Sequence, residues 1–199
     1  IERVGNIMID SYVMVRPKIE ADQTRVNMGL KAGNYGVVTL HRPSNVDDPD
    51  VLKTLVTQLV NISAKLPLVF AVHPRTRKRL QEFGLLNKLE QASQIHLTEP
   101  LGYIQFMNLV SNAKAAVTDS GGVQEESTYL GIPCLTLREN TERPITLTEG
   151  SNRLVTPENL AKNIEEVLSG KWITGTRPEH WDGQTAQRCV AALRRLAGI

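Results

Sequence analysis

The sequence is poor in cysteine and in aromatic residues, and it has no long apolar run. Only two of its 199 residues are cysteines, and Cys134 and Cys189 are too far apart for a metal-binding spacing. A chain of this length can bury a large enough core to fold without a disulfide, so we expect both thiols to be reduced. No segment reaches the ~18 apolar residues of a membrane span, and residues 1–30 lack the basic and apolar regions of a signal peptide. These absences predict a cytoplasmic protein with no membrane partner.

The sequence also lacks a strong excess of either charge. Lys and Arg total 23 against 21 Asp and Glu, a net charge of +2, and no basic run is interleaved with aromatic residues. Surfaces that bind nucleic acid carry a clear basic excess, so we expect no nucleic-acid partner. The histidines and acids show no metal-ligand spacing, such as two His one helical turn apart. We predict that neither a metal nor another cofactor is required.

The sequence does contain a regular alternation of short apolar runs and helical patterns. Apolar residues recur at helical spacing over residues 51–62, 103–110 and 160–168. Short buried strands separated by helices are typical of a parallel sheet covered on both faces. We therefore predict an α/β fold with a doubly wound, Rossmann-like parallel sheet. The expected strands are 35–40, 68–72, 95–97, 115–118, 134–137 and 154–155.

Further helices are predicted at both ends of the chain. Residues 4–30 indicate one or two helices before the first strand, and residues 185–196 indicate another after the last strand. Inside the chain, Asp48-Pro49 is typical of a helix start and Gly131 of a helix end. The chain begins at Ile1 without an initiator Met, so we expect it to be a piece of a longer protein. Both terminal helices could pack against the missing part.

Polar residues follow four of the expected strands, at the edge of the sheet where doubly wound folds bind ligands. The turn Ser120-Gly121-Gly122 exposes successive N–H groups at the positive end of a helix dipole, and its missing side chains let an anion approach. A diphosphate suits this turn, and Glu126, one helical turn beyond Gly122, could accept hydrogen bonds from ribose hydroxyls. The alternative is a tight turn whose acids stabilise the helix N-terminus. The four polar runs are 41–45, 73–75, 119–122 and 138–144.

Four other side chains could belong to such a site, and each also has a structural interpretation. Arg143 could pair with a phosphate, or form a salt bridge within its loop. Phe106 could stack on a base, or fill the core at a helical spacing. His41 and His73 each follow a strand, where they could exchange a proton or carry charge near neutral pH, or only cap a helix. The residues alone leave these alternatives open.

In combination, the residues resemble the UDP-N-acetylglucosamine 2-epimerase family. The resemblance is in order along nearly the whole chain, and the combination is much more specific than any one motif. The resemblance is strongest at residues 118–126, 130–133 and 138–144. It also includes residues 4–6, 9–10, 38–42, 72–74 and 100–103, and Phe106.

The resemblance implies a GT-B-like two-domain fold with a nucleotide sugar in the cleft between the domains. This chain would be the C-terminal half. Residues 1–33 would be a helical lead-in from the missing N-terminal domain, and residues 34–199 a UDP-binding Rossmann-like domain with a C-terminal helix. The full-length protein would be a homodimeric isomerase that interconverts UDP-GlcNAc and UDP-ManNAc by loss and re-addition of UDP, in polysaccharide biosynthesis. The isolated chain would be inactive.

The resemblance also implies a role for each site residue. His41 matches the active-site histidine of the family. Arg42 and His73 match positions that bind a second UDP-GlcNAc as an activator in some bacterial members, but the residues that follow them differ here. Allosteric activation therefore stays open, as does the choice between releasing UDP-ManNAc and hydrolysing it. For the nucleotide, Phe106 would stack on uracil, Ser120, Gly121 and Gly122 would bind the diphosphate, Glu126 would hold the ribose and Arg143 would contact the phosphates.

Two other functions fit many of the same residues. A GT-B glycosyltransferase donor domain also uses a glycine-rich turn and a ribose-binding Glu, but it leaves carbon 2 of the sugar untouched. The loop 139–144, Glu-Asn-Thr-Glu-Arg-Pro, favours the epimerases. The second alternative is a nucleotide-sugar-binding module without catalysis.

Overall fold

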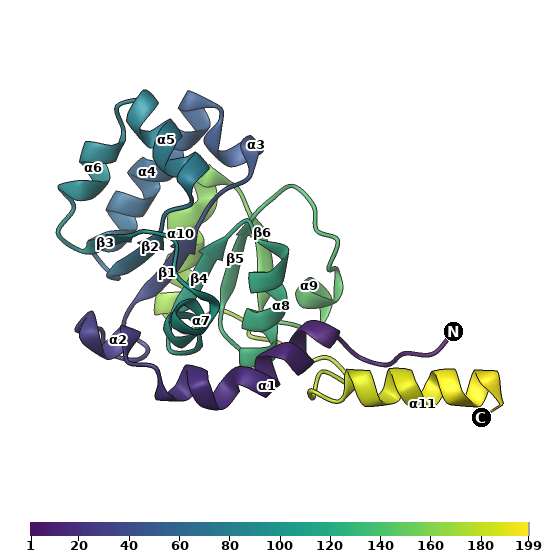
Figure 1. Ribbon diagram of the computed structural model, residues 1–199. Coiled ribbons are helices and arrows are strands. Elements are labelled where there is room, and N and C mark those ends of the chain that lie inside the picture. The colour runs from purple at the N-terminus through teal and green to yellow at the C-terminus, as the bar shows by residue number, and fades with distance from the viewer. Residues whose placement is uncertain (199) are drawn as a thin grey trace.

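A computed structural model describes residues 1–198, and in this part of the chain six parallel strands form one sheet (Figure 1). The spatial order is β3-β2-β1-β4-β5-β6, so the order reverses between β1 and β4, which pair directly. This arrangement confirms the predicted doubly wound sheet. The strands are β1 Gly36–Thr39, β2 Leu68–Ala71, β3 Ile95–Thr98, β4 Ala115–Thr118, β5 Cys134–Leu137 and β6 Asn152–Val155.

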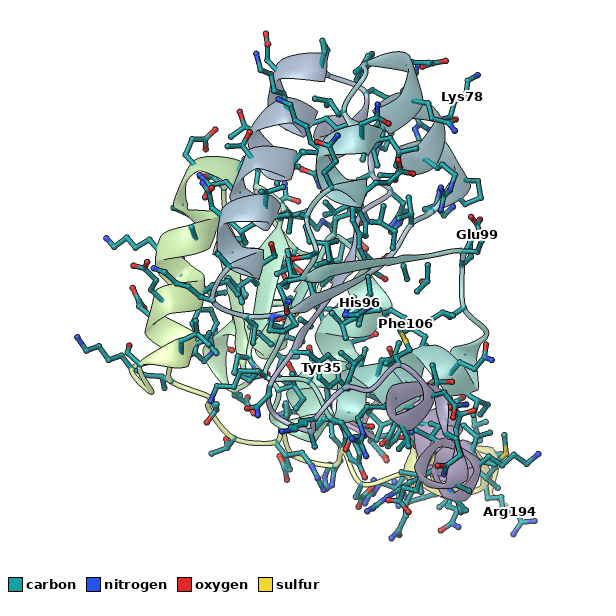
Figure 2. The ribbon with its side chains drawn as sticks, turned by 90° about the vertical axis from the view of Figure 1, so that its left-hand side faces the viewer. Tyr35, Lys78, His96, Glu99, Phe106 and Arg194 are labelled. Carbon is teal, nitrogen blue, oxygen red and sulfur yellow. The ribbon has the colours of Figure 1, made fainter. Side chains whose placement is uncertain are left out.

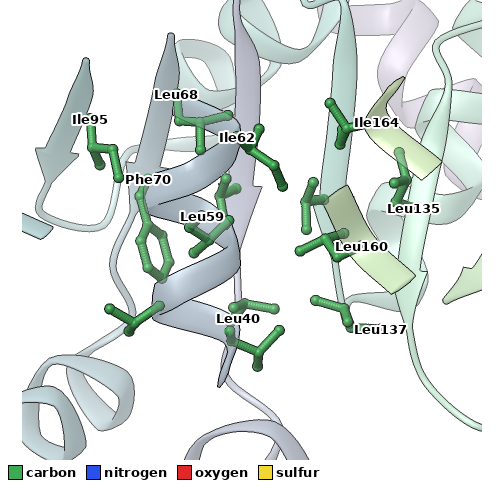
Figure 3. Packing of buried hydrophobic residues seen from close by; sticks show 14 of the residues in the cluster. Leu40, Leu59, Ile62, Leu68, Phe70, Ile95, Leu135, Leu137, Leu160 and Ile164 are labelled. Carbon is green, nitrogen blue, oxygen red and sulfur yellow. The ribbon is translucent and has the colours of Figure 1, made fainter. Parts of the chain in front are cut away.

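One face of the sheet is covered by α4 (Pro49–Ser63) and α10 (Leu160–Leu168), which pack side by side. Asp48 caps α4 by accepting hydrogen bonds from the backbone N–H groups of Asp50 and Val51, as the sequence predicts for this start. Alternate residues of the strands point to this face, because successive side chains of a strand lie on opposite sides. Figure 3 shows the resulting core, which includes Leu40, Leu59, Ile62, Leu68, Phe70, Leu135, Leu137, Leu160 and Ile164.

The opposite face is covered by α1 (Ile7–Ala21), α7 (Tyr103–Ser111) and α8 (Gly121–Leu130). Helix α1 packs on both α7 and α8. Its buried Ile9 and Tyr12 share a core with Met107 of α7 and with Val37 and Val69 of the sheet. The first residues of the chain therefore complete the hydrophobic core of the sheet domain.

The remaining helices are short or polar, and the sequence patterns did not identify most of them. The short or polar helices are α2 Thr24–Asn27, α3 Pro43–Val46, α5 Pro74–Glu82, α6 Leu86–Glu90 and α9 Ile145–Thr148, with a 3-10 turn at Pro157–Asn159. In α5 only Thr76 and Leu80 are buried, so the apolar spacing on which a sequence prediction relies is almost absent. The helical pattern predicted at residues 4–30 corresponds to α1 and α2.

Helix α11 (Thr185–Ala197) extends away from the sheet beside the N-terminal segment (Figure 1). Asp10 of α1 caps it by accepting hydrogen bonds from the backbone N–H groups of Thr185 and Ala186, at 3.1 and 2.7 Å. Glu2 pairs with Arg195 further along α11. The two end segments are thus fastened to each other.

The cysteines and the helices bear on the expected thiol state and membrane character of the chain. Cys134 is buried, Cys189 is partly exposed, and both are free thiols. Among residues 1–198, no helix has the length and apolar character needed to cross a bilayer.

Candidate functional site

The carboxyl ends of β1, β2 and β4 surround a hollow of about 220 Å³ at the edge of the sheet. Parallel strands end on the same edge, and the reversal of strand order beside β1 leaves a crevice there. Four residues proposed from the sequence line it together: His41, His73, Phe106 and Ser120. Phe106, labelled in Figure 2, belongs to α7. The other lining residues are Thr39, Ala71, Pro100, Leu101 and Val123.

His41 is held by a buried carboxylate. Its Nδ1 lies 2.8 Å from Oδ1 of Asp119, which is fully buried, whereas 39% of the His41 side chain is exposed. The hydrogen bond to Asp119 raises the pKa of His41 above its ordinary value, against the opposing effect of burial. Because Nδ1 is engaged, Nε2 is the ring nitrogen left for a ligand.

Asp119 is the main site residue to which the sequence analysis gave no role. Its carboxylate also accepts hydrogen bonds from the backbone N–H groups of His41 and Arg42, both at 2.9 Å, and from Nδ2 of Asn45 at 3.0 Å. Burial acts to raise the pKa of Asp119, but the hydrogen bonds from His41, Arg42 and Asn45 outweigh it and keep that pKa below its ordinary value. A charged Asp119 thus fixes both the loop after β1 and the His41 ring.

Arg42 and His73, which the resemblance matched to activator binding, both lie close to His41. The Arg42 side chain donates from Nε to the backbone oxygen of Asp119, at 3.1 Å. His73 is the N-cap of α5, where its Nδ1 accepts a hydrogen bond from the N–H of Arg75. The ring centroids of His41 and His73 are 5.6 Å apart, so both imidazoles face the same hollow.

The Ser120-Gly121-Gly122 turn forms the N-terminus of α8, as the sequence predicts. Ser120 is the N-cap residue, with an extended backbone, and Gly121 is the first residue of the helix. The first N–H groups of a helix have no partner within it, so this end can bind an anion. A Cβ atom added at Gly121 would lie 3.2 Å from Nε of Arg143. The absence of a side chain at Gly121 therefore lets the guanidinium sit directly over the helix start.

Arg143 is held at that position by acidic neighbours. Its Nη1 lies 2.9 Å from Glu142 and its Nε lies 3.4 Å from Oε1 of Glu125. The same Glu125 oxygen accepts a 3.0 Å hydrogen bond from Nδ2 of Asn6, which precedes α1. The salt-bridge interpretation and the phosphate interpretation of Arg143 are therefore compatible, because a guanidinium has five N–H donors.

Glu126 lies on α8, three residues beyond Val123, and is not itself one of the residues that line the hollow. Only 4% of its surface is exposed, and its Oε1 accepts a 2.7 Å hydrogen bond from the hydroxyl of Tyr103. Burial raises the pKa of Glu126 to about 7, and the Tyr103 hydrogen bond opposes that rise. The sequence analysis missed Tyr103, because it is brought to Glu126 by the packing of α7 on α8.

No group of three or more His, Cys, Asp or Glu side chains gathers as metal ligands anywhere in residues 1–198. The hollow and the adjoining start of α8 bring together an imidazole–carboxylate pair, a helix N-terminus, a guanidinium and an aromatic ring. Such a set suits an anionic ligand that also carries a flat ring.

Comparison of the sequence with known proteins identifies the family of the chain. Residues 1–194 match the sequence profile described as UDP-N-acetylglucosamine 2-epimerase. The chain belongs to that family. One relative, a UDP-N-acetylglucosamine 2-epimerase of Methanococcus maripaludis, is 42% identical over 186 residues, which are 90% of this chain and 49% of that protein.

Members of the epimerase family also resemble the chain in structure. The crystal structure of the Methanocaldococcus jannaschii UDP-GlcNAc 2-epimerase in complex with UDP-GlcNAc and UDP has a TM-score of 0.81 and 36% sequence identity, and the match covers 96% of this chain and 54% of that one. A UDP-2,3-diacetamido-2,3-dideoxy-D-glucuronate 2-epimerase of Pseudomonas aeruginosa is 33% identical, over 98% of this chain and 53% of that protein. The chain therefore spans about half the length of these relatives, as one half of a GT-B-like fold does.

Proposed function

We propose that the full-length protein interconverts UDP-GlcNAc and UDP-ManNAc, and that this chain supplies the half that binds UDP. The observation that carries the proposal is the pairing of His41 with buried Asp119 beside the N-terminus of α8, with Arg143 over that terminus. The family of the chain supports the reaction type, and the hollow lined by Phe106 supports a nucleotide ligand. The proposed site residues are those named from the sequence, with Asp119 and Tyr103 added.

Epimerisation by elimination requires a good leaving group. When the proton on carbon 2 is removed, its electron pair forms the carbon 1–carbon 2 double bond, and the bond from carbon 1 to the diphosphate oxygen breaks toward UDP. The departing oxygen gains negative charge. Fixed N–H groups at the start of α8 and the Arg143 guanidinium would stabilise that charge without rearranging. His41, whose raised pKa favours the imidazolium, would add a positive charge or a proton.

The family resemblance implies that the groups that move the carbon 2 proton lie largely in the N-terminal domain, outside this chain. We therefore expect the isolated chain to bind UDP and to turn nothing over. Helix α11 supports the expectation of a contact with another part of the same protein. Three of its apolar side chains, Val190, Leu193 and Leu196, expose half or more of their surfaces along one stripe. The free thiols are in keeping with a reducing, cytoplasmic setting.

The test uses the full-length protein with UDP-GlcNAc in D2O, followed by proton NMR. Deuterium at carbon 2 with appearance of the manno product supports the epimerase. A stable carbon 2 combined with tight UDP binding would instead favour a glycosyltransferase donor domain or a binding module. Exchange with UDP-2,3-diacetamido-2,3-dideoxy-D-glucuronate but not with UDP-GlcNAc would keep the reaction and change the substrate.

A further inference from the structure

Helix α7 brings two aromatic side chains to the site from one face. Phe106 lines the hollow, and Tyr103 lies one turn before it as the first residue of the helix. Residues three apart on a helix are neighbours on its surface. Tyr103 is 42% exposed, yet its hydroxyl reaches across to α8 and donates to Oε1 of Glu126. The two helices are thus joined by one polar contact beside the hollow.

Glu126 has acceptor capacity that the protein leaves unused. A carboxylate offers about four lone-pair sites. Within the described chain, the bond from Tyr103 is the one hydrogen bond that the Glu126 carboxyl makes. Among residues 1–198, its Oε2 makes no hydrogen bond and is not among the fully buried polar atoms that lack a partner, so this oxygen keeps contact with solvent and a donor can reach it. A ligand with two adjacent hydroxyl groups would supply the missing donors.

We propose that Tyr103 is a positioning residue that holds Oε1 of Glu126, so that the remaining lone pairs of this carboxyl accept hydrogen bonds from the ribose hydroxyls of the nucleotide. The inference rests on the proposed function, in which Glu126 takes the ribose and Phe106 the base. Because Tyr103 and Phe106 belong to one helix, α7 fixes the spacing between the ring that stacks on the base and the ribose acceptor. The site then distinguishes a ribonucleotide from its deoxy form through a residue that does not touch the ribose.

The Tyr103 hydroxyl also influences the charge of Glu126, and this second effect likewise favours binding of the ribose. Burial raises the pKa of Glu126, the neighbouring Glu125 of α8 raises it further, and the Tyr103 hydroxyl lowers it. Glu126 also interacts electrostatically with Tyr12 of α1, whose pKa is raised mainly by burial and slightly by the charge of Glu126. Loss of the Tyr103 hydroxyl therefore leaves more of Glu126 protonated, and a protonated carboxyl is a weaker acceptor.

The test measures binding of UDP and of 2′,3′-dideoxy-UDP to the full-length protein by calorimetry. Tyr103→Phe keeps the ring and removes only the hydroxyl. It should weaken UDP about tenfold, the scale of a hydrogen bond to a charged group, and leave dideoxy-UDP within about twofold. Tyr129→Phe is the matched control, because Tyr129 lies on α8 and packs against Tyr12 and Arg177, and it should change neither affinity.

Glu126→Gln is the second variant, and it tests whether the effect of Tyr103 on UDP affinity depends on Glu126. In that background Tyr103→Phe should cause little further loss of UDP affinity, because the two residues act as a unit. An equal loss of affinity for UDP and for dideoxy-UDP in Tyr103→Phe would overturn the positioning role. A full tenfold loss of UDP affinity when Tyr103→Phe is added to Glu126→Gln would overturn it as well. In either case, carbon 2 exchange by the wild-type protein would still support the epimerase. Failure of the wild-type protein both to bind UDP and to exchange carbon 2 would overturn the proposed function and this inference together.

Discussion

The replacement Asp119→Asn gives the sharpest test of the site, because it replaces one buried carboxylate oxygen by an NH2 group and keeps the shape of the side chain. The Asp119 carboxylate receives hydrogen bonds from Nδ1 of His41, from two backbone N–H groups and from Nδ2 of Asn45. An asparagine offers one acceptor oxygen and a donating NH2 group. At least one or two of these charge-assisted bonds must be lost, which corresponds to about 2–4 kcal/mol of unfolding free energy.

The pH dependence of that loss follows from the two pKa shifts. The pKa of His41 is raised in the folded chain, so its contribution to stability is complete below about pH 6.5 and is lost as pH rises through the raised value. The pKa of Asp119 is lowered, so its contribution is present above about pH 4 and is lost as pH falls through the lowered value. The stability difference between wild type and Asp119→Asn should therefore be largest between about pH 4 and pH 6.5.

Urea unfolding across this pH range and an NMR titration of the His41 ring measure both quantities on the 199-residue chain. In the variant, the pKa of His41 should fall from its raised value, since its charged partner is gone. Asp47→Asn is the control, because Asp47 pairs with Arg75 and Arg79 away from the hollow. An unchanged His41 pKa in Asp119→Asn would refute the argument that Asp119 holds the imidazolium.

Arg143, His41, Gly5 and the isolated chain each give a further prediction. Arg143→Ala should weaken UDP binding by about 1.5–3 kcal/mol, and an unchanged affinity in calorimetry would remove Arg143 from the site. UDP affinity should fall by about 1 kcal/mol as pH rises through the raised pKa of His41, a small effect because the ring is partly exposed, and an affinity that stays flat as pH rises above about 6.5 would contradict this role. Gly5 has φ +111° and an added Cβ would lie 2.3 Å from the backbone oxygen of His180, so Gly5→Ala should lower the unfolding free energy by about 2–4 kcal/mol in a denaturant titration; wild-type stability would count against this packing. The isolated chain should bind UDP and show no deuterium uptake at carbon 2 of UDP-GlcNAc, and measurable uptake by this chain alone would show that no second half is needed.

Much of the fold could be predicted because apolar patterns determine which segments are buried. The predicted strand at residues 115–118 coincides with β4, and the predicted start of α4 at Asp48-Pro49 is the observed one. Strand β6 is the instructive difference, since it begins at Asn152 rather than at residue 154. Its first two side chains are polar, and Arg153 is accommodated over the ring of Trp172 and beside Glu166. A pattern of apolar residues cannot reveal an edge strand stabilised in this way.

The site was predictable as a set of residues but not as a set of contacts. Sequence position indicates that His41 and Asp119 each follow a strand, whereas their contact depends on β1 pairing with β4, in the register that aligns Thr39 with Thr118. The contact of Tyr103 with Glu126 depends in the same way on how two helices pack. Such pairs are set by tertiary structure, and neither propensity nor spacing along the chain encodes them.

The contacts of Asn6 connect the N-terminal segment to Arg143 at the start of α8. Asn6 donates a hydrogen bond to Glu125, and Glu125 pairs with the guanidinium of Arg143, while Glu2 in the same segment pairs with Arg195 of α11. A ligand anion that drew Arg143 away from Glu125 would therefore also change the contact that holds Asn6. The packing of the N-terminal segment and the position of the guanidinium are thus coupled through one carboxylate, that of Glu125.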